Sequence, residues 1–196
     1  MANNTKDLIL EKALVMFSNN GYEKTNIREI SESLGMTKSV FYKHYTSKEE
    51  LWNKMLNKLE EYYEEHFGSD NNLPEIPNTF DEFKDLALKL FKFTISDQKV
   101  ITTRKILLIE QFRDDRVCKL ASKHFVEGLE SMFTKIFKGM IDKGLIKQGD
   151  PSMLAFAFVT PISSLVQMSD REPSRKKEIL KKMKDFVDYF VSTYCI

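Results

Sequence analysis

The sequence is poor in the residues that mark secreted, metal-binding and membrane proteins. It has two cysteines, Cys118 and Cys195, which lie far apart and match no metal-ligand spacing. We interpret them as free, buried thiols in a reducing cytoplasm, with a redox sensor as the alternative. No apolar run approaches the roughly 20 residues that a membrane-spanning helix requires, and the first residues show no secretion-signal pattern. We therefore expect a cytoplasmic protein that does not enter a membrane.

Proline is also scarce, because none of the five prolines occurs before Pro74. Early helices can then be interrupted only by glycine and by capping residues. No segment alternates polar and apolar residues for long enough to form a sheet, whereas apolar residues recur at helical spacing almost throughout. The sequence therefore predicts an all-α fold.

Capping signals divide this helical sequence into segments. Gly21 and Gly35 each follow an amphipathic stretch, as expected where helices end. Capping boxes start three further helices, at Asn26–Glu29, Ser47–Glu50 and Thr79–Glu82. We expect a helix-turn-helix domain at residues 1–47, a linking helix at 48–67, a polar loop at 68–78, and a helical domain at 79–196 that includes a long helix at 115–143.

Charge of one sign does not dominate the chain. Lysine and arginine number 30 against 29 acidic residues, a net charge of +1, which argues against a wholly basic nucleic-acid coat protein. Residues 33–48 nevertheless contain no acidic side chain, and they include Lys38, Lys43, His44 and Lys48. Such a local basic segment is typical of a small phosphate-binding surface. The alternative is an ordinary solvated helix face.

The segment from Thr25 to Leu51 has the pattern of a helix, a tight turn, a short helix and a capped fourth helix. Its apolar residues face inward, which leaves small and basic residues outside: Lys38, Ser39, Tyr42, Lys43 and His44. A short helix of this kind fits the major groove, about 12 Å wide, while the preceding helix crosses the phosphate backbone. The alternative is a helical hairpin without a role in DNA binding.

The same segment resembles the N-terminal motif of the TetR family of bacterial regulators. Residue type and spacing agree over about the first quarter of the chain, at Thr25, Ile27, Ile30, Gly35, Thr37, Phe41, Tyr42, His44, Tyr45, Ser47, Lys48, Glu49 and Leu51. Two positions depart from the family pattern. Ser31 stands where alanine is usual and Ser39 where glycine is common, and neither change breaks the helix-turn-helix.

The resemblance implies a three-helix DNA-binding domain, a linking fourth helix, and a larger helical domain for ligand binding and dimerisation. It implies phosphate contacts by Thr25, Thr37, Tyr42, His44 and Lys48, and base contacts by Arg28, Lys38, Ser39 and Lys43. A twofold dimer would present two short helices to an inverted-repeat operator in double-stranded DNA.

The second half of the chain is rich in phenylalanine and methionine, which suit either an adaptable apolar pocket or a helical core. Candidate ligand-binding residues are Phe91, Phe112, Phe125, Leu129 and Phe133. The last two helices resemble the family's dimer-forming pair, and their apolar residues would leave an exposed patch on a monomer. Candidate interface residues are Leu154, Phe158, Ile162, Leu165, Phe186 and Phe190; alternatively, some face the monomer's own core.

The sequence contains no motif for a catalytic, metal or cofactor site. We therefore expect a dimeric transcriptional regulator, most simply a repressor that an apolar or amphipathic small molecule releases from its operator by a population shift. One alternative is a DNA-organising or cell-division protein that uses this fold with protein partners and no small ligand. The other is an enzyme built on the helical domain, which would need converging polar side chains.

Overall fold

The computed structural model describes residues 2–67 and 74–195. The regular elements of these residues are helices, as predicted, apart from one isolated bridge between Ile146 and Cys195. Part of the expected loop, residues 68–73, lies outside the described residues. The chain packs into two units, Met1–Glu64 with Thr102–Ala121, and Glu65–Ile101 with Ser122–Ile196.

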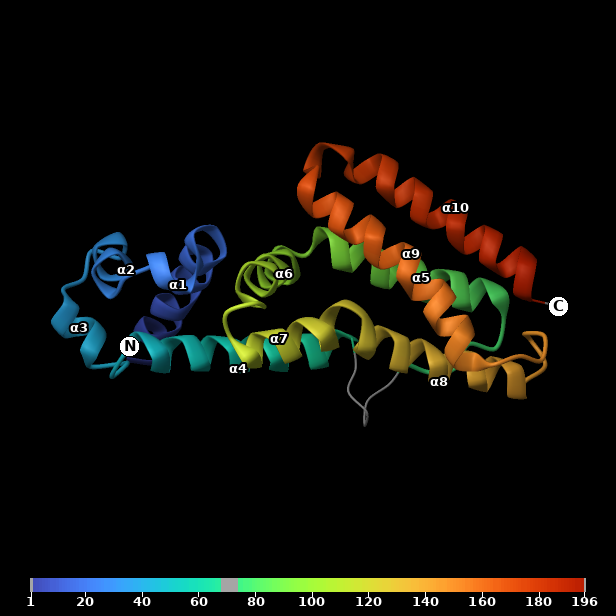
Figure 1. Cartoon of the computed structure of the whole chain (residues 1–196), viewed down its shortest axis with the longest axis horizontal. Helices are drawn as coiled ribbons and strands as arrows, with labels where there is room; N and C mark the ends of the chain where they lie inside the picture. Colours follow the sequence, from blue (N-terminus) through green and yellow to red (C-terminus); the bar gives the residue numbers. More distant parts are fainter. Residues whose placement is uncertain (1, 68–73, 196) are drawn as a thin grey trace. The chain divides into compact units, whose positions relative to one another are not determined.

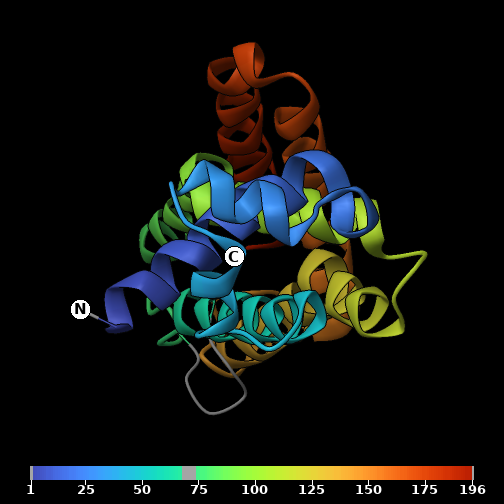
Figure 2. The same cartoon turned by 90° about the vertical axis from the view of Figure 1, so that its left-hand side faces the viewer.

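The first unit combines the predicted helix-turn-helix with residues from the middle of the chain (Figures 1 and 2). Its helices are α1 (Ala2–Lys24), α2 (Ile27–Ser33), α3 (Lys38–Tyr42), α4 (Lys48–Phe67) as far as Glu64, most of α6 (Gln98–Glu110) and α7 (Asp115–Ser122) as far as Ala121. The predicted domain at 79–196 includes the residues of α6 and α7. Their packing instead groups them with the N-terminal helices.

The core of the first unit follows the helical periodicity of the sequence. Ile9, Ala13 and Phe17 on α1 are buried, together with Ile30 on α2 and Phe41 on α3. Each such large apolar side chain contributes about 1.5–3 kcal/mol when it leaves water. The three helices are thereby held to one another, although α3 has only five residues and would not be stable alone.

The second unit is built from α5 (Phe80–Ser96), α8 (Gly128–Asp142), α9 (Pro151–Arg171) and α10 (Lys176–Tyr194). In Figure 1, α9 and α10 form the orange and red hairpin, joined through a short 3₁₀ turn at Pro173–Arg175. Phe158 of α9 is central to the core. Its ring centroid lies 4.8 Å from that of Phe133 on α8 and 4.8 Å from that of Phe190 on α10.

The structure corrects two expectations, a continuous helix at 115–143 and two buried thiols. The predicted continuous helix contains a π-helical turn at Lys123–Glu127 between α7 and α8, and within this turn the carbonyl of Phe125 accepts a hydrogen bond from Ser163 Oγ at 3.0 Å. The thiols are free, as expected, but Cys118 is exposed and Cys195 is half-buried. Cys118 lies on α7 at the edge of the buried face that is formed by Val117, Leu120 and Ala121.

Candidate DNA-binding site

The turn between α2 and α3 depends on backbone hydrogen bonds and on one glycine. Asn26 Oδ1 accepts from the backbone N–H of Glu29 at 2.9 Å, which confirms the predicted start of α2. At the other end, Gly35 has a φ of 65°, a conformation that only glycine adopts readily. The N–H groups of Leu34 and Met36 both reach the carbonyl of Ser31, so the turn is closed on both sides.

Helix α3 presents one polar and basic face to solvent. Phe41 is fully buried beneath it, and Val40 is half-buried. Residues three and four positions apart share a helix face, as do Lys38, Ser39, Tyr42 and Lys43, and Thr37 precedes them at the N-cap. All five side chains are exposed. We call these five residues the α3 face. His44, directly after it, is half-buried.

Thr37 occupies the N-cap position of α3, but its side chain makes no capping hydrogen bond. The hydroxyl is exposed and lies where the N–H groups of the first helical turn are also open. Thr37 can therefore offer a hydroxyl to a phosphate, as the resemblance implies.

Thr25 has a different environment from the one expected for a phosphate contact. Its side chain is fully buried, and its hydroxyl donates to the carbonyl of Gly21 at 2.8 Å. The side chain therefore caps the end of α1 and is closed to DNA, so the structure does not support the expected contact.

Arg28 is exposed on α2 and pairs with Glu32 one turn later, with 2.6 Å between Arg28 Nε and Glu32 Oε1. This hydrogen bond raises the pKa of Arg28 above its ordinary value. Among the residues that the structure describes, none pairs with the two terminal nitrogens of this guanidinium, which are the groups that recognise guanine in the major groove.

The comparisons with known proteins agree with this geometry. The family model for bacterial regulatory proteins of the tetR family matches residues 9–55. IcaR, a negative transcriptional regulator of the biofilm operon icaADBC in Staphylococcus epidermidis, is 36% identical over 58 residues, 30% of this chain and 31% of IcaR. YuxN, a regulator of the same type from Bacillus subtilis, is 40% identical over 60 residues, 31% of this chain and 20% of YuxN. The chain thus matches less than a third of the length of each relative.

Solved structures extend the likeness to the whole fold. SmeT, the repressor of the multidrug efflux pump SmeDEF of Stenotrophomonas maltophilia, has a TM-score of 0.67 at 15% identity, over 97% of this chain and 90% of SmeT. A protein from Saccharomonospora viridis, crystallised in complex with choline, has a TM-score of 0.71 at 14% identity, over 99% of both chains. The first quarter of the chain thus matches the tetR family model, and the whole chain has the fold of these solved regulators.

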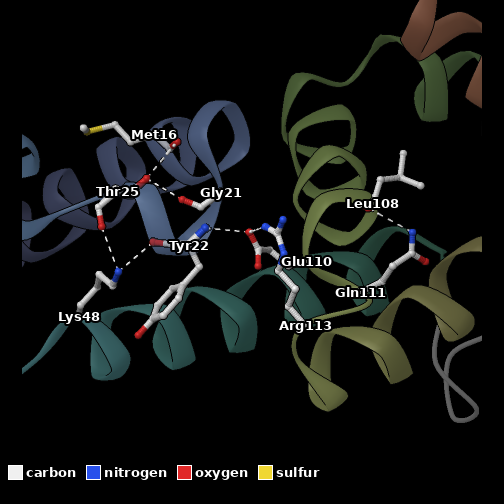
Figure 3. A network of polar contacts seen from close by, with 9 residues as sticks. All are labelled: Met16, Gly21, Tyr22, Thr25, Lys48, Leu108, Glu110, Gln111 and Arg113. Carbon is white, nitrogen blue, oxygen red and sulfur yellow. Dashed lines mark hydrogen bonds and ion pairs between the residues drawn. The ribbon is translucent and has the colours of Figure 1, made fainter.

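Within this TetR-family fold, a polar network joins α6 to the helix-turn-helix (Figure 3). Glu110, at the end of α6, is 3% exposed, and its Oε1 accepts from the backbone N–H of Tyr22 at 2.8 Å. On the other side of Tyr22, its carbonyl accepts from Lys48 Nζ at 2.9 Å. No local pattern predicts this role for Glu110, because 88 positions separate it from Tyr22.

Trp52 packs inside the same unit. Its ring centroid lies 5.0 Å from those of Phe17 and Tyr22, and its Nε1 donates to Asp114 Oδ2 at 3.1 Å. Asp114 also accepts from the N–H of Arg116 at the start of α7. Trp52 therefore lies between α1 and the α6–α7 turn, where its fluorescence would report their separation.

Gly21 and Gly35 provide a matched pair for testing the network. Gly21 has φ 77° and ψ 170°, a region essentially restricted to glycine, and a Cβ there would lie 2.6 Å from Glu110 Oε1. A Cβ at Gly35 would meet nothing within 4 Å. We expect Gly35→Ala to cost about 1–2 kcal/mol for backbone strain. Gly21→Ala should cost about 1.5–3 kcal/mol more, because it displaces the charged acceptor of Tyr22. Urea unfolding measures both, and equal losses would contradict this role of Glu110.

The candidate ligand-binding residues do not all lie together. Phe91 and Phe133 are buried in the core of the second unit, while Phe125 and Leu129 are half-buried in the same unit. Phe112 belongs to the first unit and is 90% exposed. It follows the end of α6, in the turn before α7, so the expectation that it lines an enclosed pocket is wrong.

The candidate dimer residues are mostly core residues. Phe186 is half-buried, and the other five are buried within the single chain: Leu154, Phe158, Ile162, Leu165 and Phe190. The exposed patch expected from them does not form, because they face α5, α8 and each other in the second unit. A different face of α9 carries the exposed apolar side chains.

Proposed function

We propose that this chain is a dimeric, sequence-specific DNA-binding transcriptional regulator, most simply a repressor. The observation that carries the proposal is the α3 face, a basic surface on a helix-turn-helix whose inner residues Ile30, Phe41 and Tyr45 are buried. A rigid support of this kind lets a few side chains reach base edges while others contact phosphates.

The individual roles follow from side-chain chemistry. Lys38, Ser39 and Lys43 would contact bases together with Arg28, because lysine and arginine donate to guanine and a serine hydroxyl serves any base. Thr37, Tyr42 and His44 would contact phosphates. Lys48 would also contact a phosphate, because its ammonium keeps a third N–H besides the two donated to Tyr22 and Thr25. Thr25 is left out of this set because its buried hydroxyl already donates to the carbonyl of Gly21.

Selection of bound duplexes from a random DNA pool tests the proposal. We expect one inverted repeat to be enriched, and to remain enriched at higher salt, where nonspecific phosphate contacts weaken steeply. Binding that disappears with salt and enriches no motif would overturn the proposal and favour the DNA-organising alternative. IcaR is named a negative transcriptional regulator and SmeT a repressor, which supports the proposal that this chain regulates transcription.

The dimer in this proposal rests on α9. This helix is long and apolar enough, by length and composition alone, to span a bilayer, a property that core helices of soluble proteins share. Eight of its 21 residues are buried in the second unit. The opposite side is exposed and follows helical spacing: Met153, Phe156, Ala157, Thr160, Pro161 and Ser164. We call these six residues the α9 face.

A second copy of the chain is the occupant that suits the α9 face. Met153 is 60% exposed and Phe156 is 48% exposed, and three positions separate them, so they share a helix face. Large apolar side chains that are exposed together mark interaction sites. The small residues Ala157 and Ser164 allow two copies of the helix to approach closely. A twofold axis through this face would pair each α9 with its copy.

Release by a small apolar or amphipathic molecule completes the proposal. Two observations support a small-molecule ligand. The second unit has half-buried apolar side chains, including Phe125 and Leu129, and the similar protein from Saccharomonospora viridis was crystallised in complex with choline. The protein would act in the cytoplasm, where bacterial DNA lies. A library of small amphipathic cations and apolar acids, screened for loss of operator binding, tests this part, and a library without any releasing compound would count against it.

A further inference from the structure

Helix α2 carries an ion pair on its exposed surface. Arg28 and Glu32 lie one turn apart and therefore share a face of the helix. Arg28 Nε donates to Glu32 Oε1 at 2.6 Å, and both side chains are mostly exposed. An ion pair in this setting adds little to the free energy of unfolding. Its consequence is instead the direction in which the Arg28 guanidinium points.

The backbone beneath the pair is fixed. Ile30, which lies between the two residues in sequence, is fully buried. Asn26 Oδ1 caps the first turn of the helix by accepting from the N–H of Glu29 at 2.9 Å. Arg28 and Glu32 therefore keep a constant separation along the backbone, and only their side chains can change position.

The bond to Glu32 uses the guanidinium donor that is nearest the main chain. A guanidinium has five N–H donors in a rigid, planar fork. With the Nε–H directed at Glu32, the plane of the fork is set, and Nη1 and Nη2 at its far end carry the other N–H groups. Guanine presents N7 and O6 side by side in the major groove, where two N–H groups of one arginine bind them together. An arginine whose plane is already set loses less side-chain entropy when it makes this contact.

We infer that Glu32 is a positioning residue that determines specificity, because it holds Arg28 so that Nη1 and Nη2 bind the guanine of one G·C pair in each half-site. Arg28 contacts a base in the proposed function, on which this inference rests. Without the carboxylate, the guanidinium can turn and donate a single hydrogen bond to other acceptors, such as N7 of adenine or O4 of thymine. The preference for guanine then weakens.

Glu32 also acts through its charge. Its carboxylate brings a negative charge to the surface that binds DNA, and the phosphates of any sequence repel such a charge. Removal of this charge should therefore tighten binding to every duplex, while discrimination at one base pair is lost. Glu29 separates the two effects, because it carries the same charge and is exposed on the same helix, whereas the partner of Arg28 is Glu32.

Fluorescence anisotropy with two kinds of duplex measures both effects. The first kind is the inverted repeat selected from the random pool, together with three derivatives in which one G·C pair of one half-site is replaced by each of the other base pairs. Arg28→Ala identifies this pair, because the variant loses the preference at that position. We expect the wild type to favour guanine there by about tenfold or more. The second kind is an unrelated duplex without the repeat.

Glu32→Ala should reduce the preference for guanine about fivefold, the effect of one hydrogen bond. Glu32→Gln should keep most of the preference, because its amide oxygen still accepts from Arg28 Nε. Glu29→Ala should leave the preference unchanged. All three variants should bind the unrelated duplex more tightly than the wild type does, because each lacks one negative charge. Their circular dichroism spectra should match that of the wild type, since both glutamates are exposed.

The inference is overturned if Glu32→Ala keeps the wild-type preference, or if Glu29→Ala or Glu32→Gln loses as much of it as Glu32→Ala. An Arg28→Ala protein with the base preferences of the wild type would overturn it as well. In each of these cases the enriched inverted repeat still supports the proposed function. The proposed function fails instead if no repeat is enriched from the pool.

Discussion

Phe158→Ala should lower the free energy of unfolding by about 3–5 kcal/mol, as is typical when alanine replaces a buried phenylalanine. Phe158 is fully buried on α9, and its ring contacts aromatic rings from three other helices, those of Phe83, Phe133 and Phe190. The substitution leaves a cavity where these helices meet, and the surrounding helices cannot close it without losing their own contacts. Urea unfolding followed by circular dichroism measures the change.

Tyr189→Ala is the matched control for Phe158→Ala. Tyr189 is also aromatic and lies beside Phe190 on α10, but it is 64% exposed. Its replacement should change the free energy of unfolding by no more than about 0.5 kcal/mol. Similar losses for the two variants would mean that the aromatic cluster is not the core of the second unit.

Phe156→Glu should convert the proposed dimer to monomers and weaken binding to an inverted-repeat duplex by about 100-fold or more. The side chain lies near the middle of the α9 face, where a twofold axis would bring two glutamates together in an apolar interface. The fold of the monomer should survive, because Phe156 faces away from the buried residues of α9. The affinity falls because two linked recognition helices gain about 10²–10⁴ over one.

Sedimentation velocity and anisotropy together measure this effect. Gln148→Glu introduces the same charge at an exposed position outside the helices and should alter neither the sedimentation coefficient nor the affinity. A Phe156→Glu protein that still sediments as a dimer would place the interface elsewhere. A monomeric variant with wild-type affinity would show that DNA binding does not need the dimer.

Local signals in the sequence predicted the helix-turn-helix well. Asn26 caps α2 as expected, and Ser47 accepts from the N–H of Glu50 at 3.0 Å. Gly35 has the positive φ that its position after an amphipathic segment required. These features depend on residues three or four positions apart, so the sequence pattern contains all the information that they need.

The less successful predictions concern contacts between distant segments. Helical periodicity placed Phe158 and Phe190 on the apolar faces of their helices. It could not distinguish contact with the chain's own core from contact with a second copy, because α9 has an apolar residue on nearly every side. Thr25 fits the family's phosphate-binding position, yet its hydroxyl caps α1. The roles of Glu110 and Asp114 depend on how the α6–α7 turn packs, which no local spacing encodes.

Protection of guanine N7 from methylation on the selected duplex tests the central claim most directly. This atom lies in the major groove, where the account places the α3 face of each subunit. We predict two protected clusters related by twofold symmetry, with centres about 10 base pairs apart or at a multiple of that spacing. Protection should be lost in a variant that replaces both Lys38 and Lys43 with alanine. The test requires a site with guanines in both half-sites. If the wild-type protein binds such a site and protects none of these guanines, the α3 face does not enter the major groove.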